Sequence, residues 1–123
     1  MFKFYNANPS KKLVGDCTIR AISTITGIDW MTTKINIFLE SCLMYDMSSA
    51  NSVWHKYLNN LGYKRYSVPN TCPYCYTVRD FCNDNPYGHF LLGLDGHVVA
   101  VIDGDYYDTW DCGDEIVLYY WKR

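Results

Sequence analysis

The spacing of apolar positions changes along the chain, from a period typical of helices to an alternation typical of strands. In the first half, Ala21, Ile22 and Ile25 share one face of a predicted helix with the sequence CTIRAISTIT. Asp16 is a suitable N-cap for this helix, and Gly27 is suited to end it. Residues 1–15, which precede the helix, are expected to form an extended lead-in.

Two further helices are predicted before residue 63. Asp29 caps the first, in which apolar residues recur at i, i+3, i+4 and i+7 and indicate a buried face. That face comprises Ile35, Phe38, Leu39 and Cys42. The next helix opens at Ser48 or Ser49 and ends at Gly62, and its apolar face comprises Trp54, Tyr57, Leu58 and Leu61. His55 falls beside this face and is expected at the surface.

The second half of the chain is predicted to form mainly strands. A short strand over 63–68 and a short helix over 77–85 come first, and strands follow over 89–94, 97–102, 106–110 and 116–121. The dipeptide Asp103-Gly104 is typical of a two-residue hairpin turn. Helices followed by antiparallel strands indicate one α+β domain over 1–123, with N-terminal helices packed on a C-terminal antiparallel sheet.

Composition and charge narrow the class of protein. The 123 residues have the length of one domain, and 49% apolar and 20% charged residues are ordinary for a globular protein. A net charge of -2 argues against a nucleic-acid binder held by phosphate contacts. No apolar run approaches the ~20 residues of a membrane span, and no signal peptide is visible. We therefore expect a cytosolic protein that binds neither nucleic acid nor membrane.

Cys17 is the candidate nucleophile. It follows Gly15-Asp16 at the first turn of a predicted helix, where unpaired N–H groups and the helix dipole favour a thiolate. The helix that follows would hold the side chain in place, as a nucleophile requires. A buried structural cysteine is the alternative interpretation of the same position.

His97 is the candidate base, and the predicted hairpin relates it to Asp108. If residues 103–104 form the turn, His97 faces Trp110 across the two strands. Because side chains alternate faces along a strand, His97, Asp108 and Trp110 then share one face. His97 and Asp108 become diagonal neighbours, about 7–8 Å apart at Cα and closer at their tips. The carboxylate would orient the imidazole, and Trp110 would cover the bond.

Two stretches of the chain resemble the papain-like cysteine peptidase superfamily. The pattern D-C-x-x-R-A occurs at 16–21, and G-H-x-V-A-V-x-D-G followed by Y-D-T-W-D occurs at 96–104 and 107–111. The chain is most similar to short papain-fold proteins of bacteriophages and gut bacteria, and it also resembles peptidase domains that trim bacteriocin leader peptides. The resemblance implies a papain-like fold with Cys17 as nucleophile, His97 as base and Asp108 as orienting residue. If the protein is phage-encoded, it would act in the host cytoplasm.

One part of the papain-like pattern is missing. Members usually carry a Gln a few residues before the Cys, aimed at the oxyanion, and residues 10–14 contain none. Asn6 and Asn8 are the candidate oxyanion donors from farther back, and the Cys17 backbone N–H would supply a second donor. Loss of one such donor typically slows catalysis by ~10²–10³, so we expect slow turnover.

The segment C-P-Y-C at 72–75 has three interpretations. It matches the glutaredoxin active-site tetrad, although it lies outside the βαβ context of that fold. Cys72 and Cys75 also form half of a zinc site, to which Cys82 would add a third ligand. The possible fourth ligands are His89, Cys42 and Cys112. The favoured interpretation is a turn with reduced thiols and a buried Cys82, because an unsecreted chain keeps its thiols free.

Together these residues favour a cysteine hydrolase of the peptidase or isopeptidase type, with Asp16 and Trp110 lining its site. It would act on a protein or peptide through Cys17, His97 and Asp108, with a thioester intermediate and without a cofactor. Two alternatives stay open. One is a non-catalytic, phage-encoded module that binds a host protein, and the other is a small zinc-binding adaptor that uses the C-P-Y-C segment.

Overall fold

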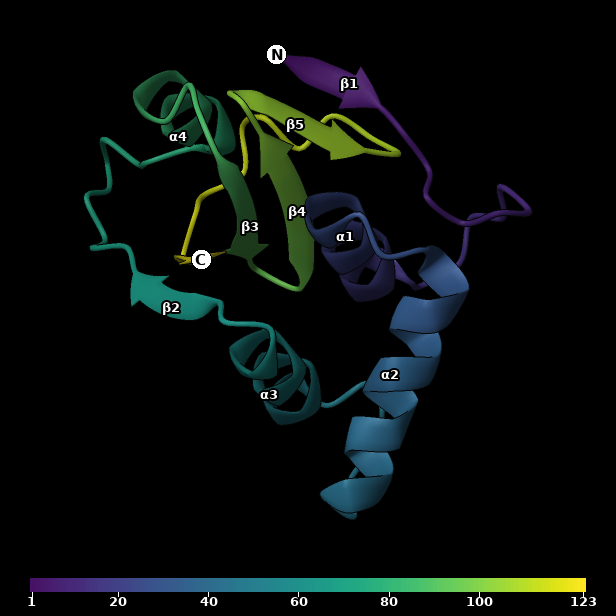
Figure 1. Ribbon diagram of the computed structural model, residues 1–123. Coiled ribbons are helices and arrows are strands. Elements are labelled where there is room, and N and C mark those ends of the chain that lie inside the picture. The colour runs from purple at the N-terminus through teal and green to yellow at the C-terminus, as the bar shows by residue number, and fades with distance from the viewer.

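The structure, a computed structural model, describes residues 1–123 and has an α+β fold of four helices and one mixed, six-stranded sheet (Figure 1). The helices are α1 (Cys17–Thr26), α2 (Trp30–Leu43), α3 (Asn51–Asn60) and α4 (Val78–Asp84). The strands are β1 (Phe2–Phe4), β2 (Lys64–Ser67), β3 (His89–Leu94), β4 (His97–Ile102), β5 (Asp105–Asp108) and β6 (Tyr119–Lys122). The α+β prediction is therefore confirmed.

The sheet has the order β1-β5-β4-β3-β6-β2. Five of its strands pair antiparallel as predicted, but β1 pairs in parallel with β5 at one edge. The prediction of a purely antiparallel sheet is thus wrong at this edge. A strand of three residues has too short a pattern to be recognised. It is held in place by long-range contacts, including an ion pair between the Met1 amino group and Asp105.

The hairpin that joins β4 to β5 has the predicted two-residue turn. Asp103 and Gly104 have φ angles of 49° and 80°, the two positive values that a type I′ turn requires. Ile102 pairs with Asp105, Val101 with Tyr106 and Ala100 with Tyr107. This register brings the end of β5 toward the beginning of β4, where His97 lies.

Neighbouring residues of the central strands pack into two hydrophobic clusters on opposite faces of the sheet. Val98 and Ala100 of β4 pack with residues of α1, α2 and α3. Val99 and Val101 of the same strand pack with residues of α4. This is the two-residue period of a strand buried on both faces. Figure 1 shows α1 beside β4, with α2 on the outer side of α1.

The predicted buried face of α2 is wrong. Ile35, Phe38 and Leu39 are 48%, 54% and 54% exposed, and Cys42 is also exposed. The buried residues of α2 are Thr33, Ile37 and Ser41. Two of these three side chains are small and polar, so a search for apolar residues overlooks the face on which α2 packs. The consequence is a row of apolar side chains on the outside of α2.

The other helices largely follow the predictions. α1 ends at Gly27 in the left-handed conformation, and α4 begins with a capping box between Thr77 and Asp80. α3 begins at Asn51, slightly later than expected.

His55 is half-buried rather than at the surface, because its ring packs against the indoles of Trp54 and Trp121. No helix has the length and apolar character needed to span a membrane.

Candidate active site

The Cys17 thiol lies at the N-terminus of α1, in a cavity of about 180 Å³ that His97 and Val98 also line. Burial raises the pKa of this thiol. Hydrogen bonds from the His97 ring and the Val98 backbone, together with the charge of His97, outweigh burial and lower the pKa below its ordinary value. The helix N-terminus adds its own stabilisation of a negative charge. The surroundings of Cys17 therefore favour a thiolate.

The predicted contact between His97 and Asp108 is present. The distance from His97 Nε2 to Asp108 Oδ2 is 2.5 Å, and the Asp108 side chain is only 2% exposed. Burial lowers the pKa of His97, but its hydrogen bonds with Asp108, Cys112 and Cys17 outweigh burial and raise it well above the ordinary value. Burial raises the pKa of Asp108, but the hydrogen bond and charge of His97 outweigh burial and lower the pKa below its ordinary value. The raised pKa of His97 and the lowered pKa of Asp108 favour an imidazolium beside a carboxylate, and the lowered pKa of Cys17 shifts its thiol toward the thiolate.

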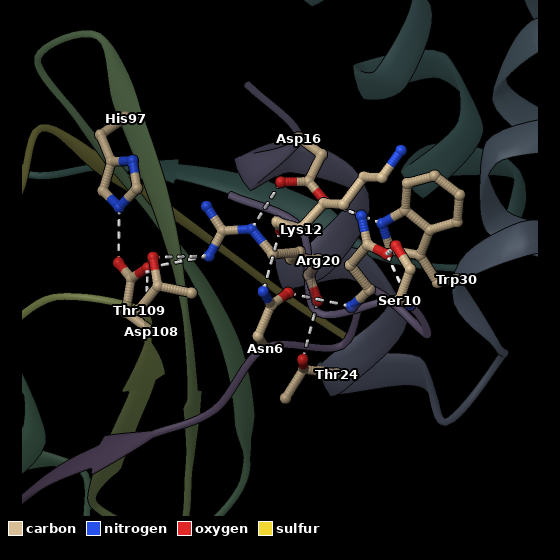
Figure 2. A network of polar contacts seen from close by, with 11 residues as sticks. Asn6, Ser10, Lys12, Asp16, Arg20, Thr24, Trp30, His97, Asp108 and Thr109 are labelled. Atoms are coloured by element: carbon tan, nitrogen blue, oxygen red, sulfur yellow. Dashed lines mark hydrogen bonds and ion pairs between the residues drawn. The ribbon is translucent and has the colours of Figure 1, made fainter. Parts of the chain in front are cut away.

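The two ring nitrogens of His97 have different surroundings. Nε2 contacts Asp108, whereas the second nitrogen lies on the opposite side of the ring (Figure 2). Nδ1 is therefore the nitrogen free to exchange a proton with Cys17 or with a bound molecule. The Trp110 ring packs on the His97 ring at 5.0 Å between centroids, as the shared face of the hairpin predicts.

Arg20 connects α1 to the sheet. Its guanidinium donates to Asp16 through Nε at 2.8 Å and to Asp108 through NH1 at 3.1 Å. The Arg20 side chain is only 12% exposed. Figure 2 shows the resulting row of side chains, which runs from His97 through Asp108 and Arg20 to Asp16 and Trp30. The i,i+4 spacing of Asp16 and Arg20 was the sequence signal for half of this network.

Asp16 does not cap α1 as predicted. Its side chain makes no hydrogen bond to the first turn, and its backbone angles, φ -113° and ψ 24°, differ from the extended geometry of an N-cap. Its carboxylate instead accepts hydrogen bonds from Arg20, from the Trp30 indole at 2.9 Å and from Asn8. The N–H groups of the first turn of α1 are thus not hydrogen-bonded by the Asp16 carboxylate, which leaves their partial positive charge available to Cys17.

Asn6 and Asn8 do not reach the cavity that Cys17 lines. Both are buried, and their side chains form hydrogen bonds within the loop that precedes α1. Figure 2 shows Asn6 in this loop, away from His97. The Asn6 amide donates to the Lys12 carbonyl at 3.0 Å, and the Asn8 amide donates to Asp16 at 3.5 Å. The prediction that they supply oxyanion donors is wrong, because the loop needs these side chains to satisfy its own polar groups.

Asn51, which the sequence interpretation overlooked, lines the same cavity as Cys17 and His97. Its Oδ1 accepts a hydrogen bond from the Trp54 indole N–H at 3.0 Å. An indole N–H is only a donor, so this contact fixes which end of the amide is oxygen. The Asn51 amide nitrogen makes no hydrogen bond within the protein. It is a donor available to a ligand beside Cys17.

The cavity also depends on the absence of a side chain at Gly93. A Cβ atom there would lie 2.1 Å from the ring of Tyr119, closer than any real contact. Tyr119 therefore lies directly over the strand at this point, and it forms part of the cavity lining. The guanidinium of Arg65 covers its ring at 4.2 Å from the centroid.

The C-P-Y-C segment does not form the predicted turn with reduced thiols. Cys72 and Cys75 form a disulfide, because the turn brings the two sulfur atoms together. Cys82 is 4% exposed and packs in the hydrophobic cluster beneath α4. The zinc alternative with Cys72, Cys75 and Cys82 as ligands is therefore wrong for this structure. The free cysteines are Cys17, Cys42, Cys82 and Cys112.

One group of side chains has the spacing of metal ligands. The ligand atoms of His97, Asp108 and Cys112 all lie within 4.8 Å of one another. The His97 nitrogen is already hydrogen-bonded to the Asp108 carboxylate, and the positive guanidinium of Arg20 lies on the same carboxylate. These contacts disfavour a further cation, so the group is better suited to sharing protons than to binding a metal.

Comparison of the chain with protein-family models, curated proteins and solved structures finds no match. The class of the site is therefore defined by its geometry. A thiol with a lowered pKa lies beside an imidazole with a raised pKa, and a buried carboxylate orients that imidazole. This combination is the general arrangement of a nucleophile, its base and an orienting group.

Proposed function

We propose that the protein is a cysteine hydrolase of the papain-like type that cleaves amide bonds in a protein or peptide. One observation carries this proposal. Cys17 and His97 share a cavity, and His97 is held by the buried Asp108. The lowered pKa of the thiol supports the same assignment, because the thiolate is the nucleophilic form of cysteine.

The first half of the reaction forms a thioester. The Cys17 thiolate attacks the carbonyl carbon of the substrate, and the carbonyl π electrons move to oxygen. When the tetrahedral intermediate collapses, the C–N bond breaks and the imidazolium of His97 gives its proton to the leaving amine. Asp108 keeps the ring in position through Nε2, so that the proton given to the amine comes from Nδ1.

The developing oxyanion needs two hydrogen-bond donors. The backbone N–H of Cys17 is one, because the first amides of a helix have no intrahelical partner. Asn51 supplies the other in place of the missing Gln, because its amide nitrogen has no protein partner and it lines the cavity. The Trp54 indole holds this amide in one orientation, so the donor is preorganised.

The second half of the reaction releases the enzyme. His97, now neutral, takes a proton from water, and the hydroxide attacks the thioester carbonyl. The C–S bond breaks, the acid product leaves, and the Cys17 thiolate is restored beside the imidazolium. No cofactor is required by this sequence of steps.

Acylation with p-nitrophenyl acetate tests the proposal without a known substrate. In a Cys42→Ser background, which removes the exposed free thiol, we expect a burst of p-nitrophenolate and an acetyl group on Cys17. Mass spectrometry would locate the acetyl group, and its slow loss would report deacylation. Cys17→Ala should abolish the burst.

The result that would contradict the proposal is acetylation of Cys17 no faster than that of Cys42 in the unmodified chain. Such a result would favour the non-catalytic binding module instead. Cys112→Ala serves as a control for the second thiol near His97, because that thiol is buried and burial raises its pKa. It should keep the burst.

A further inference from the structure

A second, larger cavity adjoins the one that holds Cys17. It has a volume of about 560 Å³ and lies between α1, α2 and the segment that leads into α3. Its apolar lining comes mainly from Ile19, Met31, Ile35, Phe38 and Trp54. This volume is within the range of pockets that bind small ligands or side chains.

The two cavities share part of their walls. Thr18 and Trp54 line both, and Gly15 and Asp16, which line the larger one, directly precede Cys17 in the chain. A molecule with its carbonyl group at Cys17 therefore has a short path into the larger cavity. Three exposed apolar residues of α2, Met31, Ile35 and Phe38, form the far wall, so part of the apolar outer face of this helix belongs to the cavity.

The lining has two charged groups, and the buried one, Asp16, already has partners. The Asp16 carboxylate is 6% exposed and accepts hydrogen bonds from Arg20 and Trp30. The Lys34 ammonium lies 5.6 Å from the centroid of the Trp30 ring. The exposed Lys34 makes no ion pair, but most of the wall is apolar, and a charged ligand group would lose water against it without gaining an ion partner, which is unfavourable.

We propose that this cavity selects a large apolar side chain of the substrate, of the size of Leu, Met or Phe, next to the bond that Cys17 attacks. The inference rests on the proposed function, and it adds the class of substrate. Filling the cavity removes the apolar surfaces of Ile35 and Phe38 from water, which supplies binding energy beside the reacting bond.

The test uses dipeptidyl acyloxymethyl ketones, which alkylate a cysteine nucleophile after binding as substrates do. Probes with Phe, Leu, Ala or Glu in either position are compared by the rate at which they alkylate Cys17 in the Cys42→Ser background. Each rate is divided by the rate with iodoacetamide, which has no side chain for the cavity. In one of the two positions, we expect Phe and Leu to react at least about tenfold faster than Ala, and Glu to react slowest.

Two variants of α2 form a matched pair. Ile35 and Leu39 are similarly exposed, at 48% and 54%, but only Ile35 lines the cavity. Ile35→Ser should reduce the preference for Phe over Ala, and Leu39→Ser should leave it unchanged. Equal probe rates in the parent protein, a preference for Glu, or equal behaviour of the two variants would overturn the inference.

The two proposals can fail separately. If iodoacetamide does not alkylate Cys17 faster than a thiol in the unfolded chain, the nucleophile assignment is wrong. If it does and the dipeptidyl probes show no side-chain preference, the cavity assignment alone is wrong.

Discussion

The side chains on the two sides of Cys17 differ in their exposure and in whether they bond to one another. On one side, His97, Asp108, Arg20 and Asp16 have side chains that are 13% exposed or less, and each bonds to the next. On the other side, Ile35 and the neighbouring apolar residues of α2 are about half exposed and form the wall of an open cavity.

This difference separates two tasks. Groups that act on a reacting bond must be in place before the substrate arrives, because reorganising charges during the reaction raises its barrier. Groups that bind a substrate must stay uncovered until it arrives, because their burial supplies the binding energy. The polar side of Cys17 has the first property, and the apolar side has the second.

The largest effect should come from removing the base on the polar side. His97→Ala should slow acylation of Cys17 by p-nitrophenyl acetate about 10²–10⁴-fold at neutral pH, because the thiol loses the base that takes its proton and the hydrogen-bond partner of its thiolate. His89→Ala is the matched control, since His89 pairs with Ile102 at the other end of β4 and should leave the rate unchanged. Equal acylation rates in the two variants would show that His97 is not the base.

Arg20→Met should have the next largest effect, on stability. Two buried carboxylates, Asp16 and Asp108, would lose their shared cation, and breaking a buried ion pair costs about 3–5 kcal/mol. Chemical denaturation would measure this loss. Arg79→Met provides the comparison, because Arg79 also pairs with two aspartates but is 46% exposed, and little change is expected. Similar losses of unfolding free energy in both variants would show that the buried network stabilises the fold no more than the exposed ion pairs of Arg79.

Asn51→Ala should slow the acylation of Cys17 by p-nitrophenyl acetate about 10²–10³-fold if Asn51 donates to the oxyanion. Alkylation of Cys17 by iodoacetamide forms no oxyanion and should change much less. Asn59→Ala, at an exposed position near the end of the same helix, controls for general effects on α3. A parallel fall in both reactions of Asn51→Ala would show that the residue only supports the structure.

The sequence predicts the polar side of Cys17 better than the apolar side. The contact between His97 and Asp108 is predictable because a two-residue Asp-Gly turn sets the register of a hairpin, and the register sets which side chains meet. The end of α1 is also predictable, since Gly27 is a local signal for a helix C-terminus and adopts the left-handed conformation there.

Long-range packing explains what the sequence analysis missed. The apolar spacing of α2 indicates a buried face, but burial depends on which elements cover the helix, and Thr33 and Ser41 make that contact instead. Asn51 reaches the cavity only because the first residues of α3 lie across the cavity from the first residues of α1. Asp16 has the residue type of an N-cap, but its contacts with Arg20 and Trp30 outweigh that local preference.

The central claim is that Cys17 and His97 form an ion pair, and its most direct test is the pH dependence of Cys17 alkylation by iodoacetamide. Because the pKa of the thiol is lowered, the thiolate should persist at pH values below about 8.5, the ordinary pKa of a cysteine thiol. The pKa of His97 is raised, so the imidazolium that accompanies it should be lost only as the pH rises far above neutrality.

In His97→Ala, the midpoint of alkylation should move to a higher pH, since burial then acts on the thiol without a compensating cation. A midpoint in the parent protein clearly below that of the variant is the predicted result. A midpoint at or above the ordinary thiol value, or one that His97→Ala leaves unchanged, would contradict the assignment of Cys17 as a nucleophile activated by His97.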